Sequence, residues 1–338
     1  MILVTGGTGL VGSHLLYKLV QQNDPVKAII RNRDKIDQVK KVFAYYSDDS
    51  DSLISKIEWV DGDILDLFTL SKAFNDVKKV YHCAAVVSFD GKKKTQMIGA
   101  NVQGTENVVN LCLNHKIDKL CHVSSIASLG GAVNGELINE ETKWTSSKTR
   151  SVYSESKFKS EMEVWRGIQE GLNAVVINPS VILGPGFWES GSGSLFTKAA
   201  AGMKYYSTGA TGFVDVRDVT SAMISLMEGD ISSERYILNS ENLSYKELFD
   251  KIADVMQVKK PRKEATIKIL KIAAFLDLLA SKIRIKKREI TKQVAISSLS
   301  VSKYSNEKIK EALGIDFIPI EKSINEMAEK FKEEITIS

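Results

Sequence analysis

A glycine-rich loop directly behind an apolar N-terminal run constrains the fold of this chain most. The run Ile2–Thr5 leads into Gly6-Gly7-Thr8-Gly9-Leu10-Val11-Gly12, and the helical pattern Ser13–Val20 follows. Glycine permits a tight turn and lets the backbone approach a pyrophosphate, whose charge meets unpaired N–H groups and the positive helix end. Strand, loop and helix in this order predict a dinucleotide site. The residues expected to form it are Gly6, Thr8, Gly9, Leu10, Val11 and Gly12.

Short apolar runs then alternate with longer helical patterns, which is typical of parallel strands joined by helical crossovers. The runs read as strands are Ile2–Thr5, Val26–Ile30, Ile57–Val60, Lys79–His82, Leu120–Ser124 and Ala174–Asn178. The helical patterns lie near Leu10–Gln22, Arg33–Tyr46, Asp66–Phe74, Met97–Asn114 and Ser151–Gln169. We therefore expect an α/β doubly wound Rossmann domain over residues 1–180.

The rhythm changes after Asn178, where glycine-rich loops and short mixed elements begin. We expect residues 181–338 to form mainly a smaller α/β substrate-binding lobe, and we leave open whether the segment near 212–240 returns to the first domain. The helices expected in this part lie near Val216–Met227, Tyr245–Met256, Ile267–Lys282 and Pro319–Lys332.

The end of the second expected strand bears on the choice of dinucleotide. An NAD-binding Rossmann domain places an acidic residue there, whereas this chain has Arg31, with Arg33 and Lys35 close by. A cation at this position favours the 2′-phosphate of NADP, although a solvated loop arginine is the alternative. Asp63, followed by Ile64, is placed to accept from the adenine amino group, or equally to cap a helix.

Tyr153 and Lys157 are four residues apart in a helical pattern, so both face the same side about one turn from each other. A phenol titrates near 10, and proton transfer at neutral pH therefore needs a nearby cation to stabilise the phenolate. We predict that this pair transfers the proton. Ser124 and Ser125 leave the carboxyl end of a strand, where either hydroxyl could bond a substrate carbonyl.

Taken together, these motifs resemble the extended short-chain dehydrogenase/reductases, in the NAD-dependent epimerase/dehydratase grouping and nearer its dihydroflavonol-reductase-like branch. The resemblance covers nearly the whole sequence. The stretches that carry it are Thr5-Gly-Gly-Thr-Gly-Leu-Val-Gly12, Asp61-Gly-Asp63, His82-Cys-Ala-Ala85, Asn101-Val-Gln-Gly-Thr105, Val123-Ser-Ser125, Tyr153 to Lys157, Asn178-Pro-Ser180 and Gly184-Pro-Gly186.

The resemblance implies roles for further residues. Ala84 and Ala85 would line the nicotinamide ribose, and Asn101 would steady the strand beside it. The family's serine lies five residues before Gly130, which selects Ser125 over Ser124. Pro179 and Ser180 would border the nicotinamide. Family members also commonly dimerise through the helices expected at Met97–Asn114 and Ser151–Gln169, so a homodimer is implied.

Two departures from the family pattern concern the substrate. Nucleotide-sugar enzymes usually carry Asn where this chain has Val181, and an Arg-Asp pair where it has Thr211-Gly212. Both changes remove groups that hold a pyrophosphate. We therefore expect an NADP(H)-dependent oxidoreductase acting on a carbonyl or alcohol of a largely apolar small molecule. A nucleotide-sugar epimerase or dehydratase is the alternative, and a non-catalytic NAD(P)-sensing regulator is the second.

Aromatic residues of the second lobe could wall such an apolar pocket, or could simply pack the lobe. They are Phe187, Trp188, Phe196, Tyr205, Tyr206 and Phe213.

Composition excludes several other classes of protein. A net charge of +4, with cations and anions interspersed, argues against nucleic-acid binding. Three cysteines without a short-spaced pair suit a reducing compartment, so we expect a cytoplasmic protein. No metal site is expected, because alternation along two strands prevents His82, Cys83, Cys121 and His122 from converging. The apolar and basic segment Ile267–Arg288 could rest on an anionic membrane surface, but we favour a helix packed on the lobe.

Overall fold

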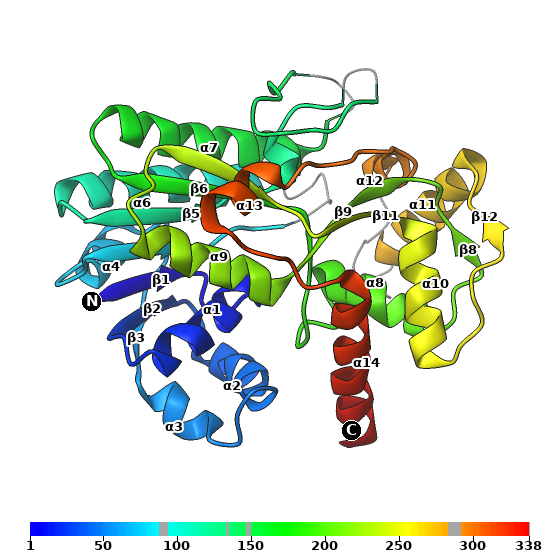
Figure 1. The fold of residues 1–338 in the computed structure, drawn as a ribbon, viewed down its shortest axis with the longest axis horizontal. Coiled ribbons are helices and arrows are strands. Elements are labelled where there is room, and N and C mark those ends of the chain that lie inside the picture. The colour runs from blue at the N-terminus through cyan, green and yellow to red at the C-terminus, as the bar shows by residue number, and fades with distance from the viewer. Residues whose placement is uncertain (88–93, 133–134, 147–149, 283–291, 338) are drawn as a thin grey trace.

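A seven-stranded, wholly parallel sheet is the centre of the molecule (Figure 1). The computed structural model describes residues 1–87, 94–132, 135–146, 150–282 and 292–337. Parallel pairing joins the strands in the order β10-β6-β5-β4-β1-β2-β3. Their bounds are β1 Ile2–Thr5, β2 Val26–Ile30, β3 Ile57–Asp61, β4 Lys79–His82, β5 Lys119–Val123, β6 Ala174–Pro179 and β10 Glu234–Leu238. The expected doubly wound Rossmann fold is confirmed.

Helices cover both faces of this sheet because its strands carry apolar side chains on both sides. One face packs against α1 (Leu10–Gln21), α2 (Ile36–Ala44), α3 (Ser50–Ser55), α9 (Val216–Glu228) and α13 (Glu307–Leu313). The other packs against α4 (Leu67–Ala73), α6 (Gly104–Asn114) and α7 (Val152–Gln169). The carboxyl ends of β1, β4 and β5 therefore lie between the two helical layers, at the edge of the sheet where the glycine loop begins.

The helix expected at Met97–Asn114 is divided in the structure. It consists of α5 (Lys94–Ile98), a π-helical segment over Gly99–Gln103, and α6. A π-helical turn inserts an extra residue into a helix and re-aims the side chains that follow. Here the segment contains Asn101, whose side chain bonds both backbone groups of Val86 after β4.

The second unit is built from small sheets and helices. A three-stranded sheet joins β7 (Val181–Leu183), β9 (Ala210–Asp215) and β11 (Glu241–Ser244), and a two-stranded sheet joins β8 (Tyr205–Tyr206) and β12 (Lys263–Glu264). Its helices are α8 (Gly191–Ala200), α10 (Tyr245–Met256), α11 (Ile267–Lys282), α12 (Lys292–Ser297) and α14 (Ile320–Ile337). The chain leaves this unit through α9 and β10 and so contributes to the main sheet again.

The aromatic residues of the second unit mostly pack its core. Phe196 and Phe213 are fully buried, and the rings of Trp188, Phe196 and Phe331 contact one another. The idea that Phe196 and Phe213 wall a substrate pocket is therefore wrong, because the lobe needs both side chains to bury its own helices.

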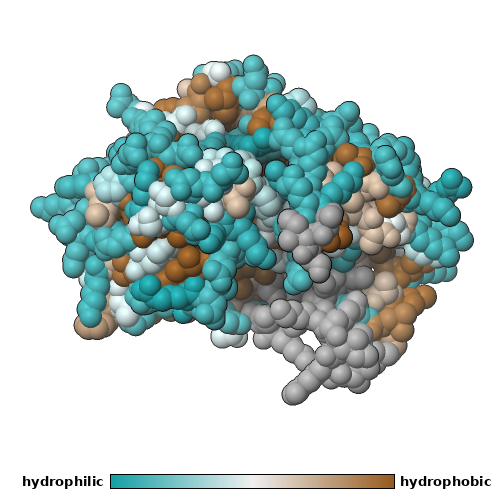
Figure 2. Space-filling model, turned by 90° about the horizontal axis from the view of Figure 1, so that it is seen from below, coloured by the Kyte–Doolittle hydropathy of each residue, from teal (hydrophilic) through white to brown (hydrophobic). Residues whose placement is uncertain are grey.

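The surface is mixed in character. Seen from below, this side of the molecule is mostly hydrophilic, and apolar side chains gather in a few separate areas (Figure 2). Among the described residues, none of the helices combines the length and apolarity that a bilayer crossing requires.

Candidate functional site

The glycine loop folds so tightly that side chains would not fit at two of its positions. A Cβ on Gly12 would lie 2.2 Å from the carbonyl oxygen of Gly6, and Gly6 itself has a φ of +71°. α1 then begins at Leu10, with Gly9 as an N-cap that offers no side-chain hydrogen bond. The first N–H groups of α1 are thus left for an anion, and the loop fits a dinucleotide pyrophosphate.

Ala84 lies directly against this loop. A Cβ on Gly6 would come within 2.6 Å of the Ala84 nitrogen, so the turn after β4 and the glycine loop are in backbone contact. The Ala84 N–H donates to the Thr5 hydroxyl at 3.3 Å, and Thr5 bonds His82 at 2.7 Å. Ala85, next in the chain, is exposed. Ala84 and Ala85 therefore lie next to the glycine loop, on the surface that a dinucleotide bound at that loop would reach.

Charged residues gather where β2 and β3 end. Arg31 Nη1 lies 3.5 Å from Asp63 Oδ2, and both side chains are partly exposed. Arg33 is bound to Asp61 instead, with Nη2 and Oδ2 2.8 Å apart. Asp63 does not cap α4, because Asp66 takes that role by accepting from Phe68 N at 3.0 Å. Of the two roles considered for Asp63, the helix cap is thus wrong.

Ile64, beside Asp63, packs against α6. A Cβ on Gly104 would meet Ile64 Cδ1 at 2.4 Å, and the Ile64 carbonyl accepts from Asn107 Nδ2 at 2.8 Å. These contacts fix the loop after β3 against α6.

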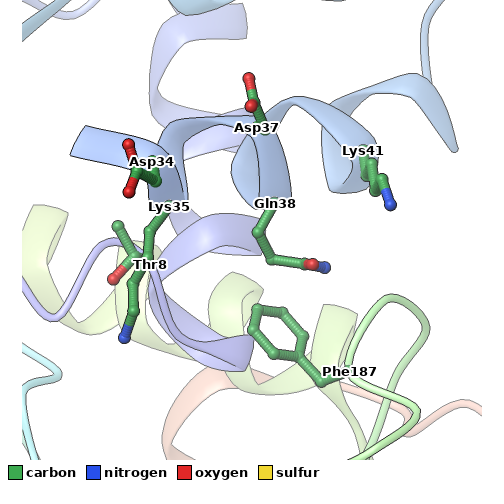
Figure 3. A pocket seen from close by; sticks show the side chains of 7 residues that line it. All are labelled: Thr8, Asp34, Lys35, Asp37, Gln38, Lys41 and Phe187. Atoms are coloured by element: carbon green, nitrogen blue, oxygen red, sulfur yellow. The ribbon is translucent and has the colours of Figure 1, made fainter. Parts of the chain in front are cut away.

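A pocket of about 340 Å³ opens beside the glycine loop (Figure 3). Thr8 points into this space from the glycine loop, Lys35 and Gln38 extend from the turn before α2 and from α2, and Phe187 approaches from the other side. The full lining is Thr8, Asp34, Lys35, Asp37, Gln38, Lys41 and Phe187. This pocket adjoins the phosphate loop and lies apart from Tyr153 and Lys157.

Tyr153 and Lys157 lie on the first turns of α7, which Ser151 caps by accepting from Ser154 N at 3.0 Å. Lys157 is buried, and its ammonium donates to the Val123 carbonyl at 2.8 Å. Burial lowers the pKa of Lys157 to about 8, and the charge of Glu161 opposes that change. Burial raises the pKa of Tyr153, while a hydrogen bond with the Ser125 side chain lowers it. The structure thus brings Tyr153, Lys157 and Ser125 together.

The two adjacent serines have different partners. Ser125 lies between Tyr153 and the 3-10 turn Ile126–Ser128, whose Ala127 N–H donates to its hydroxyl at 3.1 Å. Ser124 is buried and donates to Glu161 at 2.6 Å. Only the Ser125 hydroxyl is therefore adjacent to the tyrosine.

Glu161 is a further residue of this group that was not predicted from the sequence. Its carboxylate is buried and lies one helical turn beyond Lys157, as Lys157 lies beyond Tyr153. Burial opposes ionisation of Glu161, but hydrogen bonds and Arg235 lower its pKa overall. The donors to it are Ser124 at 2.6 Å, Ser128 at 2.7 Å, Asn178 at 2.8 Å, Arg235 at 3.1 Å and Trp165 at 3.3 Å. The only sequence signal was the continued spacing of four.

Three other expected residues lie around this group. Asn101 holds Val86 and donates to Ser156 of α7 at 3.0 Å, so its side chain ties the strand end to the helix. Pro179 ends β6. Ser180 follows and donates its N–H and hydroxyl to the Leu238 carbonyl of β10, at 2.9 and 3.1 Å.

The histidines and cysteines of β4 and β5 diverge as strand alternation requires. His82 bonds Thr105 of α6 at 3.0 Å, and its ring lies 5.2 Å from that of His122. Cys83 and Cys121 pack on the opposite face of the sheet, in the core formed with α1 and α9.

The chain is similar to several known proteins. A family model described as "Male sterility protein" matches residues 4–215. The chain is 27% identical over 267 residues to a putative dihydroflavonol 4-reductase of Synechocystis sp., covering 77% of this chain and 73% of that protein. It is 25% identical to cinnamoyl-CoA reductase 1 of Petunia hybrida, covering 98% and 92%.

Two solved structures extend the comparison. The crystal structure of gox2253 superposes with a TM-score of 0.80 at 26% identity, covering 99% of this chain and 98% of the other. UDP-glucose 4-epimerase of Thermotoga maritima superposes with a TM-score of 0.76 at 18% identity, covering 99% of both chains. The second likeness concerns the fold alone.

Proposed function

This chain belongs to the Male sterility protein family of extended short-chain dehydrogenase/reductases, as an NAD(P)-dependent oxidoreductase of the dihydroflavonol and cinnamoyl-CoA reductase type, and on that premise we propose its reaction. We propose that it uses NADPH to reduce a ketone or aldehyde on a largely apolar small molecule. The observation that carries the proposal is the hydrogen bond between Tyr153 and Ser125 beside the buried ammonium of Lys157.

The chain's own residues supply the proton and the orientation. A bound reduced nicotinamide supplies the hydride to the carbonyl carbon. Ser125 donates a hydrogen bond to the carbonyl oxygen, and Tyr153 then gives its phenolic proton to that oxygen as negative charge develops there. Lys157 stabilises the resulting phenolate by its charge. Ala84, Ala85, Pro179 and Ser180 border the nicotinamide in this proposal, and Asn101 is a positioning residue that fixes the strand end.

Two cations support NADPH over NADH. Arg31 is exposed enough to leave Asp63 for a phosphate, and Lys35 points into the pocket beside Thr8 (Figure 3). Arg33 is a poorer candidate because Asp61 already binds its guanidinium at two atoms. We propose that Arg31 and Lys35 receive the 2′-phosphate while Asp63 accepts from the adenine.

Two observations support the proposed class of substrate: the missing charged side chains at two positions of the second unit, and the names of the relatives. Val181 and Thr211 offer no charge to a nucleotide diphosphate. One relative, 28% identical over 264 residues, is called sterol demethylase protein B of Methylococcus capsulatus, and the two reductases above carry the names of aromatic substrates. Each name belongs to that protein, and the sterol and the dihydroflavonol named there favour an apolar carbonyl compound here.

The decisive test measures cofactor oxidation by the purified protein with a panel of aromatic and aliphatic ketones and aldehydes and with UDP-sugars. We expect NADPH consumption with an apolar carbonyl compound, and its loss in Tyr153→Phe but not in Tyr245→Phe, a tyrosine of α10. An epimerised UDP-sugar without net NADPH consumption would establish the epimerase alternative instead. Cofactor binding without turnover of any substrate would favour the sensing regulator.

We further propose a cytoplasmic homodimer that associates through α6 and α7, where Met162 is an exposed apolar side chain. Light scattering of the purified protein should give twice the chain mass. The variant Met162→Glu should shift it toward the single chain, and an unchanged mass would count against this surface.

A further inference from the structure

One face of α11 is apolar and exposed, while the other side of the helix packs against the protein. Ile272, Phe275 and Leu276 are 60%, 59% and 58% exposed. At 3.6 residues per turn these three positions share one side of the helix. The opposite side carries the buried residues Ala274 and Asp277. The helix is thus anchored to the protein by one side and presents large apolar side chains to solvent on the other.

Cations lie on that same exposed face. Lys268 and Lys271 are exposed and, one turn before Ile272 and Phe275, project from the same side. The stretch from 257 to 282 has seven Lys and Arg against two Asp and Glu, a net charge of +5, whereas the whole chain carries only +4. The remaining chain is therefore nearly neutral, and the positive charge of this protein is concentrated around α11.

Further exposed cations lead up to the helix. They are Lys259, Lys260, Arg262 and Lys263. Among these, Lys260 is paired with Asp254 at 2.7 Å. Apolar side chains also gather at the right-hand end of Figure 2, the end at which Figure 1 places α10, α11 and the β8–β12 pair. The basic residues that follow in the sequence, from Arg284 to Arg288, lie outside the described residues.

We propose that this face of α11 binds the surface of an anionic lipid bilayer. Ile272, Phe275 and Leu276 enter the boundary between headgroups and acyl chains, while Lys268 and Lys271 extend along the helix to lipid phosphates. Each lysine near an anionic surface adds to the attraction, and the apolar side chains gain from leaving water. Binding of this face to lipid does not depend on which substrate the enzyme reduces.

A second copy of the chain is a poorer occupant for the same face. A two-fold contact through α11 would bring the same surface of both copies together. Such a contact would bring Lys268 and Lys271 of both copies into one small interface, and the described exposed face of α11 offers no carboxylate to pair with them, so the gathered like charges disfavour association. An anionic bilayer instead matches both the lysines and the apolar side chains that follow them on the same face.

The test is co-sedimentation of the full-length protein with two kinds of vesicle, phosphatidylcholine alone and a mixture of phosphatidylcholine with phosphatidylglycerol. We expect the protein to pellet with the anionic vesicles and to stay in the supernatant with the neutral ones. Raising the salt concentration should release it, because salt screens the lysines. A protein that stays in the supernatant with both, or that binds both equally, would overturn the proposal.

Two variants and one matched control locate the surface. The combination Ile272→Ser, Phe275→Ser and Leu276→Ser should abolish pelleting. Lys268→Glu with Lys271→Glu should weaken it on the order of tenfold or more. The control, Leu65→Ser, Leu67→Ser and Phe68→Ser, removes three exposed apolar side chains around the start of α4 and should bind as the wild type does.

Light scattering and thermal unfolding accompany these variants. All substituted side chains are exposed, so an unchanged unfolding temperature is expected and would show that lost binding is not lost folding. If the α11 variants pellet like the wild type, the face does not bind lipid. If they instead lower the molar mass of the protein while wild-type binding to vesicles is absent, the face joins two copies and the proposal is wrong.

Discussion

The Glu161 carboxylate accepts a 2.6 Å hydrogen bond from Ser124, the residue directly before the serine that bonds Tyr153. Through Ser128, Asn178 and Arg235 the same carboxylate also joins the 3-10 turn after β5 to β6 and β10. One buried charge thereby ties α7 to the strand ends that carry the proposed site. We infer that Glu161 is a positioning residue that also sets the charge of Lys157.

The pH dependence of the reduction rate should show the protonation of Lys157. If protonated Lys157 is required, kcat/KM for reduction should fall as the pH rises through about 8, the pKa to which burial lowers this lysine. Glu161→Gln removes the negative charge that opposes this lowering. The falling limb should therefore move to lower pH, by roughly one pH unit. The measurement is kcat/KM from pH 6 to 10 at roughly half-unit steps.

Glu163→Gln is the matched control, since Glu163 lies on the same helix and pairs with Arg166 at 2.9 Å. It should leave the limb in place. Removing one partner of a buried ion pair costs roughly 3–5 kcal/mol, so Glu161→Gln should also unfold more easily. A destabilised variant whose limb stays at the wild-type pH would show that Glu161 acts on structure alone.

Substitutions of the two adjacent serines should have different effects, one mainly on kcat and the other mainly on the free energy of unfolding. Ser125→Ala should lower kcat by roughly 10²-fold, because it removes a donor to the reacting oxygen, and should cost only about 1 kcal/mol of stability, for the lost cap of the 3-10 turn. Ser124→Ala should leave a buried carboxylate one donor short and cost about 1–3 kcal/mol, with a smaller effect on kcat. Turnover and urea unfolding of both variants decide the matter, and equal losses of kcat would contradict the assignment of Ser125.

The two arginines after β2 should differ in their effect on the cofactor. Arg31→Ala should raise the KM for NADPH by roughly 10-fold or more and leave that for NADH nearly unchanged, because only NADPH carries the 2′-phosphate. Arg33→Ala is the control, since its side chain is bound to Asp61. Initial rates with both cofactors give the comparison. An equal rise for NADPH and NADH in Arg31→Ala would remove this residue from the phosphate site.

Buried histidines should make the protein sensitive to mild acid. Burial lowers the pKa of His14 to about 4 and of His82 to about 3, and that of His122 falls well below its usual range. Below pH 6.5 these side chains take up protons in the unfolded chain but stay neutral in the folded one. Stability is thus complete above about pH 6.5 and declines as the pH falls, by about 1.4 kcal/mol per pH unit for each histidine.

His122 offers the sharpest test of this effect. Among the described residues, neither of its buried ring nitrogens has a hydrogen-bond partner. His122→Leu should therefore reduce the slope of unfolding free energy against pH between 6.5 and 5 by roughly a third. His115→Leu, at an exposed position, is the control. Denaturant titrations across this pH range provide the slopes, and parallel lines for wild type and His122→Leu would refute the account.

Most of the fold that could be predicted followed from local sequence patterns. A strand, a glycine loop and a helix in sequence have one common outcome, and the alternation of apolar runs with helical patterns predicted six strands of the main sheet. The spacing of Tyr153 and Lys157 needed only the geometry of one helix. The π-helical segment at Gly99–Gln103 was not predicted, and it contains Asn101, whose bond with Val86 joins residues 15 apart and so leaves no mark in a local pattern.

What the sequence by itself determined was most strands and helices of the first domain, the dinucleotide loop and the residue types able to move a proton, because each depends on neighbours within one or two turns. Only the tertiary structure decided the partners: Arg235 and Glu161 are 74 residues apart, and Ser124 and Glu161 are 37 apart. It also decided that the apolar side of α11 is exposed. Burial and pairing depend on which segments pack together, and that is a property of the whole folded chain.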